Sequence, residues 1–260
     1  MATCALCKKD TDEVGPLQQS HIIPRLFLQK TKIEGRGLHY NARDKSFAVA
    51  QVDWKEYLLC TNCEKTLKGH EDLLQEVLYL RRKTAWQQIG RRRLRLKIAA
   101  NDVALALITI LWRASISTVE PFRTFSMSAA LNETIRGWII TGNLSHLWHI
   151  HVSIDIQQIV FQGHKQTLFV SPVLRDRPLG HIGGDCLFFF GGYFVKFMIP
   201  TPRQTVGLRR LQPGSQAVDI RSIELMDIPE LNDIHTEMLF TPMSTKVKQQ
   251  VEENAKRKRK

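Results

Sequence analysis

Ser20-His21-Ile22-Ile23-Pro24 is the stretch around which the chain is organised, because a Cys-x-x-Cys pair flanks it on each side. Cys4 and Cys7 precede it, and Cys60 and Cys63 follow it after a long intervening segment. Two such pairs can close one tetrahedral structural zinc site that joins segments far apart in the sequence. The alternative is four free or disulfide-bonded thiols. Because the first ten residues contain no apolar stretch typical of a secretory signal, we expect metal ligands rather than disulfides.

The composition is that of a soluble globular protein, apart from its charge. Of the 260 residues, 43% are hydrophobic and 24% are charged, and the formal net charge is +12 with a pI near 9.7. This excess favours a polyanionic partner such as DNA, RNA or an anionic membrane surface, although an ordinary solvated basic surface explains it almost as well. The longest apolar run, Val103 to Trp112, is too short to cross a bilayer. We therefore expect a soluble, cytoplasmic protein without a membrane partner.

The residues between the cysteine pairs predict a short strand followed by a long insertion. Leu17 to Ile23 has the apolar ends of a strand, and Pro24 closes it. His21 is therefore expected at the end of this strand. Residues 25–54 show no clean period, and a loop of this length inside a compact module is usually functional or disordered.

A second strand and a helix are predicted after the insertion. Residues 55–59 are compatible with a strand that ends at the second cysteine pair. Residues 64–88 carry apolar side chains at helical spacing. On this helix Glu64 and Glu71 lie two turns apart on one face, with His70 beside them.

The rest of the chain predicts two helices followed by strands. Apolar spacing indicates helices at residues 103–115 and 127–140. From Leu147 the period changes to two, so residues 148–156 are expected to form a half-buried strand. Further strands are expected at residues 167–170, 186–190, 193–199 and 217–225, before a weak helix at 229–239 and a charged tail at 246–260.

These elements indicate an α+β protein. Residues 1–90 would form a zinc-binding module. Residues 91–260 would form a helical bridge and an antiparallel β-rich domain that ends in a basic tail. The size of this second part suggests that it restrains or assembles the module, either through a protein partner or through self-association.

The order strand, loop, strand, helix, held by four cysteines, resembles the HNH endonuclease family with its ββα-metal site. The residues that carry the resemblance are Cys4-x-x-Cys7, Ser20-His21-Ile22-Ile23-Pro24-Arg25, Leu58-Leu59-Cys60-x-x-Cys63-Glu64 and Glu71. The chain looks most like a Cys4 zinc branch in prokaryotes, some members of which are associated with defence against foreign DNA. The resemblance extends over residues 1–75 and implies a ββα-metal fold and an endonuclease.

The resemblance also implies a role for each matching residue. His21 corresponds to the general base that activates water against a backbone phosphorus, because an imidazole has its pKa near working pH. A Mg²⁺ or Mn²⁺ ion would stabilise the charge that develops at the phosphate. Ser20 stands where the family has an Asp ligand. The expected catalytic metal ligands are therefore Glu64, which would also take part in catalysis, and then Glu71 and His70. The alternative for these three is an ordinary solvated helix face.

Basic residues are candidates for phosphate contacts. Arg25 could clamp the scissile phosphate, or it could be an ordinary surface cation. The basic run that follows the helix could line a nucleic-acid backbone, and its alternative is a solvated surface. The candidates in this run are Arg81, Arg82, Arg91, Arg92 and Arg93.

The expected function is a metal-dependent endonuclease that cleaves phosphodiester bonds in DNA with His21 as general base. RNA is the second candidate substrate. The alternative function is a non-catalytic zinc module that binds DNA or a protein partner, and the departure at Ser20 favours it.

Overall fold

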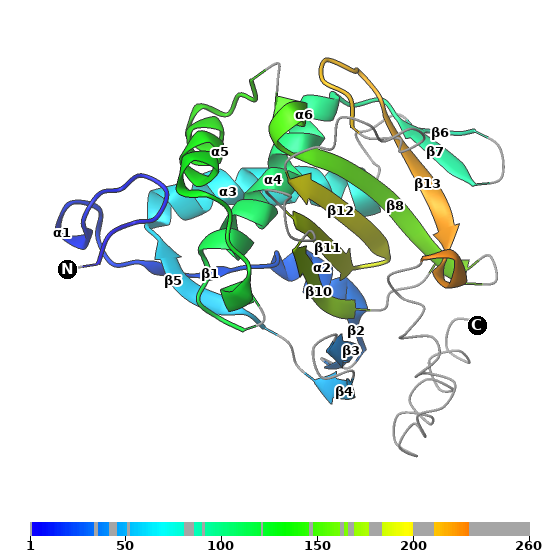
Figure 1. The fold of residues 1–260 in the computed structure, drawn as a ribbon, viewed down its shortest axis with the longest axis horizontal. Coiled ribbons are helices and arrows are strands. Elements are labelled where there is room, and N and C mark those ends of the chain that lie inside the picture. Colours follow the sequence, from blue (N-terminus) through cyan, green and yellow to red (C-terminus); the bar gives the residue numbers. More distant parts are fainter. Residues whose placement is uncertain are drawn as a thin grey trace.

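The computed structural model places the main elements of the chain and gives their packing. It describes residues 2–33, 36–41, 46–50, 53–80, 86–89, 92–120, 122–145, 148–161, 164–165, 169–176, 184–199 and 211–228. Helices and a mixed sheet occur together, which confirms the α+β class. The N-terminal loop and a two-stranded unit lie at one end of the molecule, and a large twisted sheet lies at the other (Figure 1).

The two-stranded unit carries the residues that the sequence singles out. Strands β1 (Gln18–His21) and β5 (Lys55–Leu59) pair antiparallel, and the short helix α1 (Thr11–Val14) precedes them. Helix α3 (Thr61–Gln75) begins directly after Cys60, whose extended backbone occupies the N-cap position. His21 is the last residue of β1, as predicted.

The helix after the second cysteine pair ends earlier than predicted. Helix α3 ends at Gln75, and a π-helical segment, Glu76–Leu80, follows it directly. The prediction of helix at residues 86–88 is wrong, because Trp86–Gln88 forms strand β6. Strand β6 pairs antiparallel with β7 (Arg93–Leu96), so hydrogen bonds to a neighbouring strand replace those of a helix.

The insertion contains regular structure that its sequence does not reveal. It consists of α2 (Arg25–Thr31), β2 (Lys32–Ile33), β3 (Arg36–Asn41) and β4 (Ser46–Ala50). Strand β3 pairs antiparallel with β2 and β4, and parallel with β10 (Phe169–Asp176) from much later in the chain. The expectation of an irregular loop is therefore wrong here: β3 pairs with both of its neighbours in the chain, and its pairing with β10 leaves no trace in the local period.

The large sheet is mixed. Within the described residues it has 11 strands, in the order β2-β3-β10-β11-β12-β8-β13-β7-β6, with β4 beside β3 and β9 beside β8. The strands not yet given are β8 (Ser153–Phe161), β9 (His164–Lys165), β11 (Gly184–Phe190), β12 (Tyr193–Ile199) and β13 (Val218–Glu224). The β3–β10 and β8–β13 pairs are parallel, so the expectation of an antiparallel sheet is wrong for these two pairs.

The strand predicted from residue 148 begins later than expected. Trp148–His151 forms the one-turn helix α6, and β8 starts at Ser153. The Trp148 side chain is fully buried, and its indole N–H donates at 3.1 Å to Asn101, a residue of the earlier helix α4 (Ala100–Ile116). These tertiary contacts override the local alternation of polar and apolar residues.

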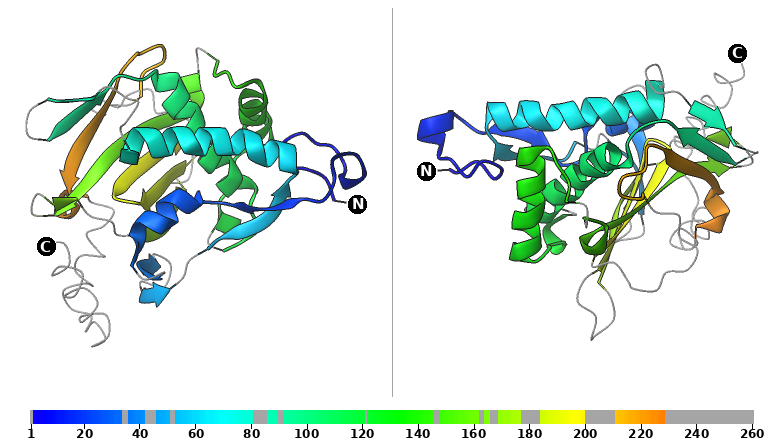
Figure 2. Two further views of the ribbon diagram at one scale, coloured as in Figure 1. Left: turned by 180° about the vertical axis from the view of Figure 1, so that it is seen from behind. Right: turned by 90° about the horizontal axis from the view of Figure 1, so that it is seen from above.

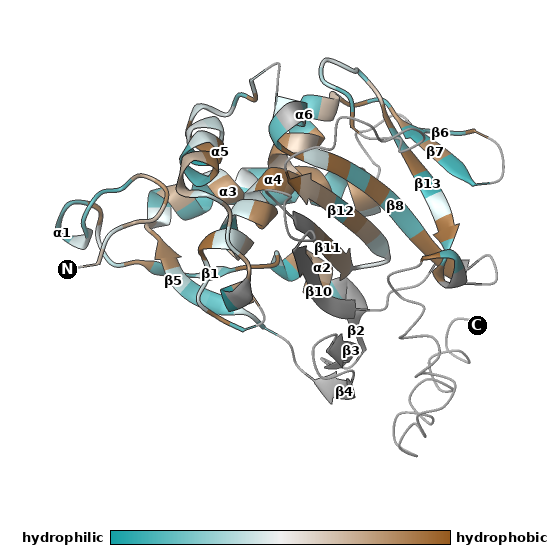
Figure 3. Ribbon diagram, in the orientation of Figure 1, coloured by the Kyte–Doolittle hydropathy of each residue, from teal (hydrophilic) through white to brown (hydrophobic). Residues whose placement is uncertain are grey.

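Two further helices pack on each other. Helix α4 (Ala100–Ile116) is buried at every residue from Val103 to Ser115, and α5 (Ala129–Thr141) packs on it. Helices α3 and α4 pack against each other and connect the hairpin with the large sheet (Figure 2). Apolar residues cover α4 and the inner strands (Figure 3). Within the described ranges, no helix has both the length and the apolar character that crossing a membrane requires.

One cluster of buried side chains extends from Cys4 in the N-terminal loop to Ile220 in β13. Both sides of residue 90 contribute to it, since α3 packs on α4 and β3 pairs with β10. The two-domain division at this residue stays a prediction. The helix predicted at 229–239 and the tail at 246–260 lie outside the described residues.

Candidate functional site

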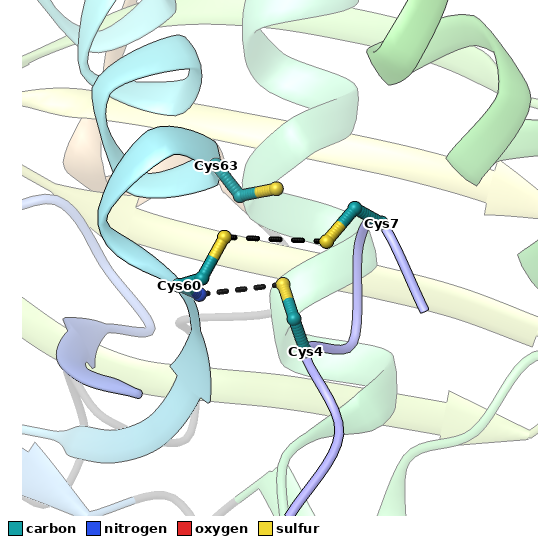
Figure 4. A group of neighbouring side chains, drawn as sticks. All are labelled: Cys4, Cys7, Cys60 and Cys63. Carbon is teal, nitrogen blue, oxygen red and sulfur yellow. Dashed lines mark hydrogen bonds between the residues drawn. The ribbon is translucent and has the colours of Figure 1, made fainter. Parts of the chain in front are cut away.

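The four cysteines lie together in space (Figure 4). Cys4 and Cys7 come from the N-terminal loop, and Cys60 and Cys63 come from the start of α3. All four Sγ atoms lie within 4.8 Å of one another, and the Sγ atoms of Cys7 and Cys60 are 4.0 Å apart. With Zn–S bonds of about 2.3 Å, a tetrahedral site separates neighbouring sulfurs by about 3.8 Å. The cluster could therefore hold a metal ion such as zinc.

Backbone hydrogen bonds shape the loop that presents the first pair. The Lys8 N–H donates to the carbonyl of Cys4, and the Cys4 N–H donates to the carbonyl of Lys9, each at 2.9 Å. Lys8 has a φ of 63°, which closes this tight turn. Burial raises the pKa of Cys4, but backbone N–H donors, above all that of Cys60 at 3.3 Å, lower it to about 7. These donors favour the thiolate of Cys4, which is the form that binds metals, whereas burial raises the pKa of Cys7.

A pocket of about 530 Å³, lined mostly by charged and amide-bearing residues, lies between the β1–β5 hairpin and α3. Its helical wall is a single stripe of residues three or four apart: Thr61, Glu64, Lys65, Lys68, Glu71, Asp72 and Gln75. Its other wall consists of Gln18, Gln19, His21, Leu26 and Lys55. The structure therefore brings three of the predicted site residues, His21, Glu64 and Glu71, to one pocket.

His21 lies against a carboxylate that precedes β5. Its Nε2 is 2.9 Å from Oδ1 of Asp53, and Oδ2 of Asp53 is 2.7 Å from the Lys55 ammonium. The Nε2–H bond does not point at the oxygen, so this contact is electrostatic rather than an aligned hydrogen bond. Burial lowers the pKa of His21, Asp53 acts against this lowering, and Lys55 adds to it. The net lowering keeps the imidazole neutral at neutral pH.

Ser20 forms a hydrogen bond with Glu64, the first of the predicted catalytic metal ligands. The Ser20 side chain is fully buried, and its hydroxyl donates to Oε2 of Glu64 at 2.8 Å. Ser20 therefore holds Glu64 toward β1.

Arg113 contacts both the backbone of β1 and the carboxylate of Glu71. Its side chain is fully buried in α4. Its Nη1 donates to the carbonyl of His21 at 2.7 Å and lies 2.8 Å from Oε1 of Glu71. Its Nε and Nη2 are buried without a partner. A guanidinium this far from water needs a counter-charge, and Glu71 supplies it.

Two predicted site residues lie outside the pocket lining. Arg25 is the exposed first residue of α2. Burial lowers the pKa of His70, and the charge of Arg113 lowers it further. Neither Arg25 nor His70 is among the residues that line the pocket.

Converging metal ligands occur at one place in the described part of the chain. Among groups of three or more His, Cys, Asp or Glu side chains there, the four cysteines alone have ligand atoms close enough to share an ion. His21, Glu64 and Glu71 line a common pocket, yet their ligand atoms do not converge in this way. A Mg²⁺ ion usually takes one or two carboxylates together with waters and substrate phosphates, so this pocket could supply a part of such a set.

The basic run after α3 makes cross-strand ion pairs where it is described. Arg93 and Arg95 on β7 both reach Asp219 on β13, and Nε of Arg95 lies 2.7 Å from the carboxylate. The hydrogen bond from Arg95 is the largest cause that lowers the pKa of Asp219 to about 2. Arg92 lies 3.8 Å from Glu224 on the same strand. The remaining predicted nucleic-acid residues fall outside the described ranges: Arg81, Arg82 and Arg91.

Sequence reasoning does not single out three residues that surround His21. Asp53 and Lys55 alternate just before the apolar end of β5, and this period of two places them on one face. Arg113 is the single charge within residues 103–115, a segment that is otherwise apolar on all faces. Charged residues are almost never fully buried unless they are paired, so Arg113 signalled a buried ion pair.

Comparisons of the chain with protein-family models, with curated proteins and with solved structures gave no match in any of the three. The resemblance to HNH endonucleases therefore rests on the residues and the element order themselves. A function has to be argued from the geometry and chemistry of the pocket.

Proposed function

We propose that the protein is a metal-dependent endonuclease of the HNH type that hydrolyses phosphodiester bonds in DNA. The observation that carries this proposal is the pocket that His21 shares with Glu64 and Glu71. The cysteine cluster at the start of α3 supports it further, because a metal there would fix α3 relative to the N-terminal loop. The association with antiviral defence belongs to the same proposal and rests on the family resemblance.

In this proposal His21 takes a proton from the attacking water. Its Nε2 is buried against Asp53, so Nδ1 is the nitrogen that accepts the proton. Asp53 orients the ring and stabilises the imidazolium that forms. Glu64, with Glu71 less directly, would hold a Mg²⁺ or Mn²⁺ ion, which neutralises charge on the phosphate when it is bound. The exposed Lys65 and Lys68 are placed to contact neighbouring phosphates.

Plasmid cleavage with Mg²⁺ or Mn²⁺ tests this proposal. The unaltered protein is compared with His21→Ala and with His151→Ala, an exposed histidine on α6 that serves as the matched control. Alanine at position 21 keeps the backbone carbonyl to which Arg113 donates, so the site should stay folded. We expect cleavage by the unaltered protein and by His151→Ala, and its loss in His21→Ala. Equal cleavage by all three, or by none, would contradict the assignment, and a parallel reaction on structured RNA distinguishes the two substrates.

A specific observation supports the second candidate, a zinc module without catalysis that binds DNA or a protein partner. Two of the three carboxylates that line the pocket already have partners inside the protein, Glu64 with Ser20 and Glu71 with Arg113. Binding of DNA in a mobility-shift experiment, without cleavage under any divalent ion, is the result that this function predicts.

A further inference from the structure

Tyr57 is the most exposed large hydrophobic side chain in the described part of the chain. Its side chain is 63% exposed, whereas the next two residues of β5, Leu58 and Leu59, are buried. Ile140 on α5 and Leu80 are the other exposed large hydrophobic residues there, at 50% and 40%. Tyr57 is the one that lies in the hairpin that carries His21.

The strand register places Tyr57 on the same face of the hairpin as His21. Gln19 lies opposite Tyr57, and His21 lies opposite Lys55. Because side chains alternate along a strand, these four share one face, while Ser20 and Glu56 point to the other. Tyr57 follows Lys55 by two residues, which corresponds to about 6.8 Å along the strand.

The hydroxyl end of Tyr57 is anchored beside the pocket. Nε2 of Gln19, a residue of the pocket wall, donates to the Tyr57 hydroxyl at 3.2 Å. This bond restrains the ring while the ring itself remains open to solvent. An exposed aromatic ring next to a pocket that contains lysines is the arrangement with which proteins stack bases of single-stranded nucleic acid.

We propose that Tyr57 is a base-stacking platform for an unpaired nucleotide, and that the pocket accepts a single-stranded or locally opened nucleic acid. This inference rests on the proposed function, because it assigns the substrate class of the same pocket. The offset between Tyr57 and the His21–Lys55 pair is of the order of one nucleotide step in an extended strand. A base stacked on Tyr57 would therefore belong to a nucleotide adjacent to the phosphate that faces His21. Bases inside a duplex are stacked on both faces and cannot offer one to the ring, so the platform selects unpaired strands.

Fluorescence of 2-aminopurine tests the platform, because stacking quenches this base. A single-stranded DNA or RNA oligonucleotide that contains 2-aminopurine is titrated into the His21→Ala protein, which should bind without cutting. We expect quenching on binding. Adding Tyr57→Leu, which keeps an apolar side chain but removes the ring, should abolish the quenching and weaken binding roughly 5- to 150-fold. Adding Tyr57→Phe, which keeps the ring, should restore both, and adding Ile140→Ala is the control on an exposed apolar residue elsewhere.

Two results would overturn the platform. One is that the Tyr57→Leu protein binds the oligonucleotide as tightly, and quenches 2-aminopurine as strongly, as the protein that keeps Tyr57. The other is tighter binding of a fully paired duplex than of the single strand with the same sequence. Failure of the platform is separable from failure of the nuclease. Stacking that depends on Tyr57 without cleavage by the unaltered protein rejects the nuclease alone, and cleavage with binding that is indifferent to Tyr57 rejects the platform alone.

Discussion

Arg113 should contribute strongly to stability, because it is a fully buried charge that joins two elements of the site. Arg113→Met keeps the apolar length of the side chain and removes the charged hydrogen bond to the carbonyl of His21, worth about 1.5–3 kcal/mol, together with the buried ion pair to Glu71. Part of this loss is offset, because the substitution also removes the buried charge with its two unpartnered nitrogens. Glu71 is 21% exposed and can regain water. We therefore expect a loss of about 3 kcal/mol in the free energy of unfolding, at the lower end of the range for breaking a buried pair.

Urea unfolding followed by tryptophan fluorescence measures this loss by linear extrapolation. Arg123→Met is the matched control, because Arg123 is 65% exposed and pairs with Glu120 on the surface. Its expected effect is below about 1 kcal/mol. The double variant Arg113→Met with Glu71→Met should lose less than the sum of the two single changes, since one partner's removal already breaks the pair. An Arg113→Met variant no less stable than Arg123→Met, or fully additive losses, would refute this account of the buried pair.

Two further predictions concern the metal and the general base. Purified protein should contain about one zinc per chain, and Cys60→Ser with Cys63→Ser should lose it and unfold at lower urea; a folded, zinc-free unaltered protein in metal analysis would contradict this. The pH dependence of kcat/KM should show an acid limb below the ordinary histidine pKa of 6.5, because burial lowers the pKa of His21 and the neutral base is lost as the pH falls through that value. Asp53 raises this pKa, so Asp53→Asn should move the acid limb to lower pH. Lys55 lowers the pKa, so Lys55→Gln should move the limb to higher pH. Shifts of the limb in the same direction in both variants would exclude His21 as the titrating base.

The sequence predicts the part of the site that short motifs define. The spacing of Cys4, Cys7, Cys60 and Cys63 implies one cluster, and the four sulfurs lie together. The position of His21 at a strand end follows from the local pattern and Pro24. These features need no knowledge of distant partners, because the chemistry of the ligands and the turn specifies them locally.

The parts that the sequence does not predict depend on long-range partners. Strand β3 is ordered by β10, and α6 is held where a strand was expected by the contact of Trp148 with Asn101. The basic run is compatible with a nucleic-acid surface and with a solvated one, and its role stays a prediction; its sequence does not reveal that Arg93 and Arg95 pair with Asp219 across the sheet. In each case a tertiary contact adds what the local pattern does not contain.

Glu64 and Glu71 differ in what they can do in the pocket, because their partners differ. A carboxylate has about four acceptor positions, and Ser20 uses one of those on Glu64, so several remain for an ion or a phosphate-bound water. The hydroxyl also brings no charge, so Ser20 does not offset the charge of a carboxylate at this position. Glu71 differs, because its charge already balances the buried Arg113, and drawing it toward an ion would leave that cation unpaired away from water. In the proposed nuclease Glu64, rather than Glu71, would therefore be the carboxylate that binds a catalytic metal at low cost, and Glu71 would act chiefly by holding Arg113 and, through it, the backbone of His21.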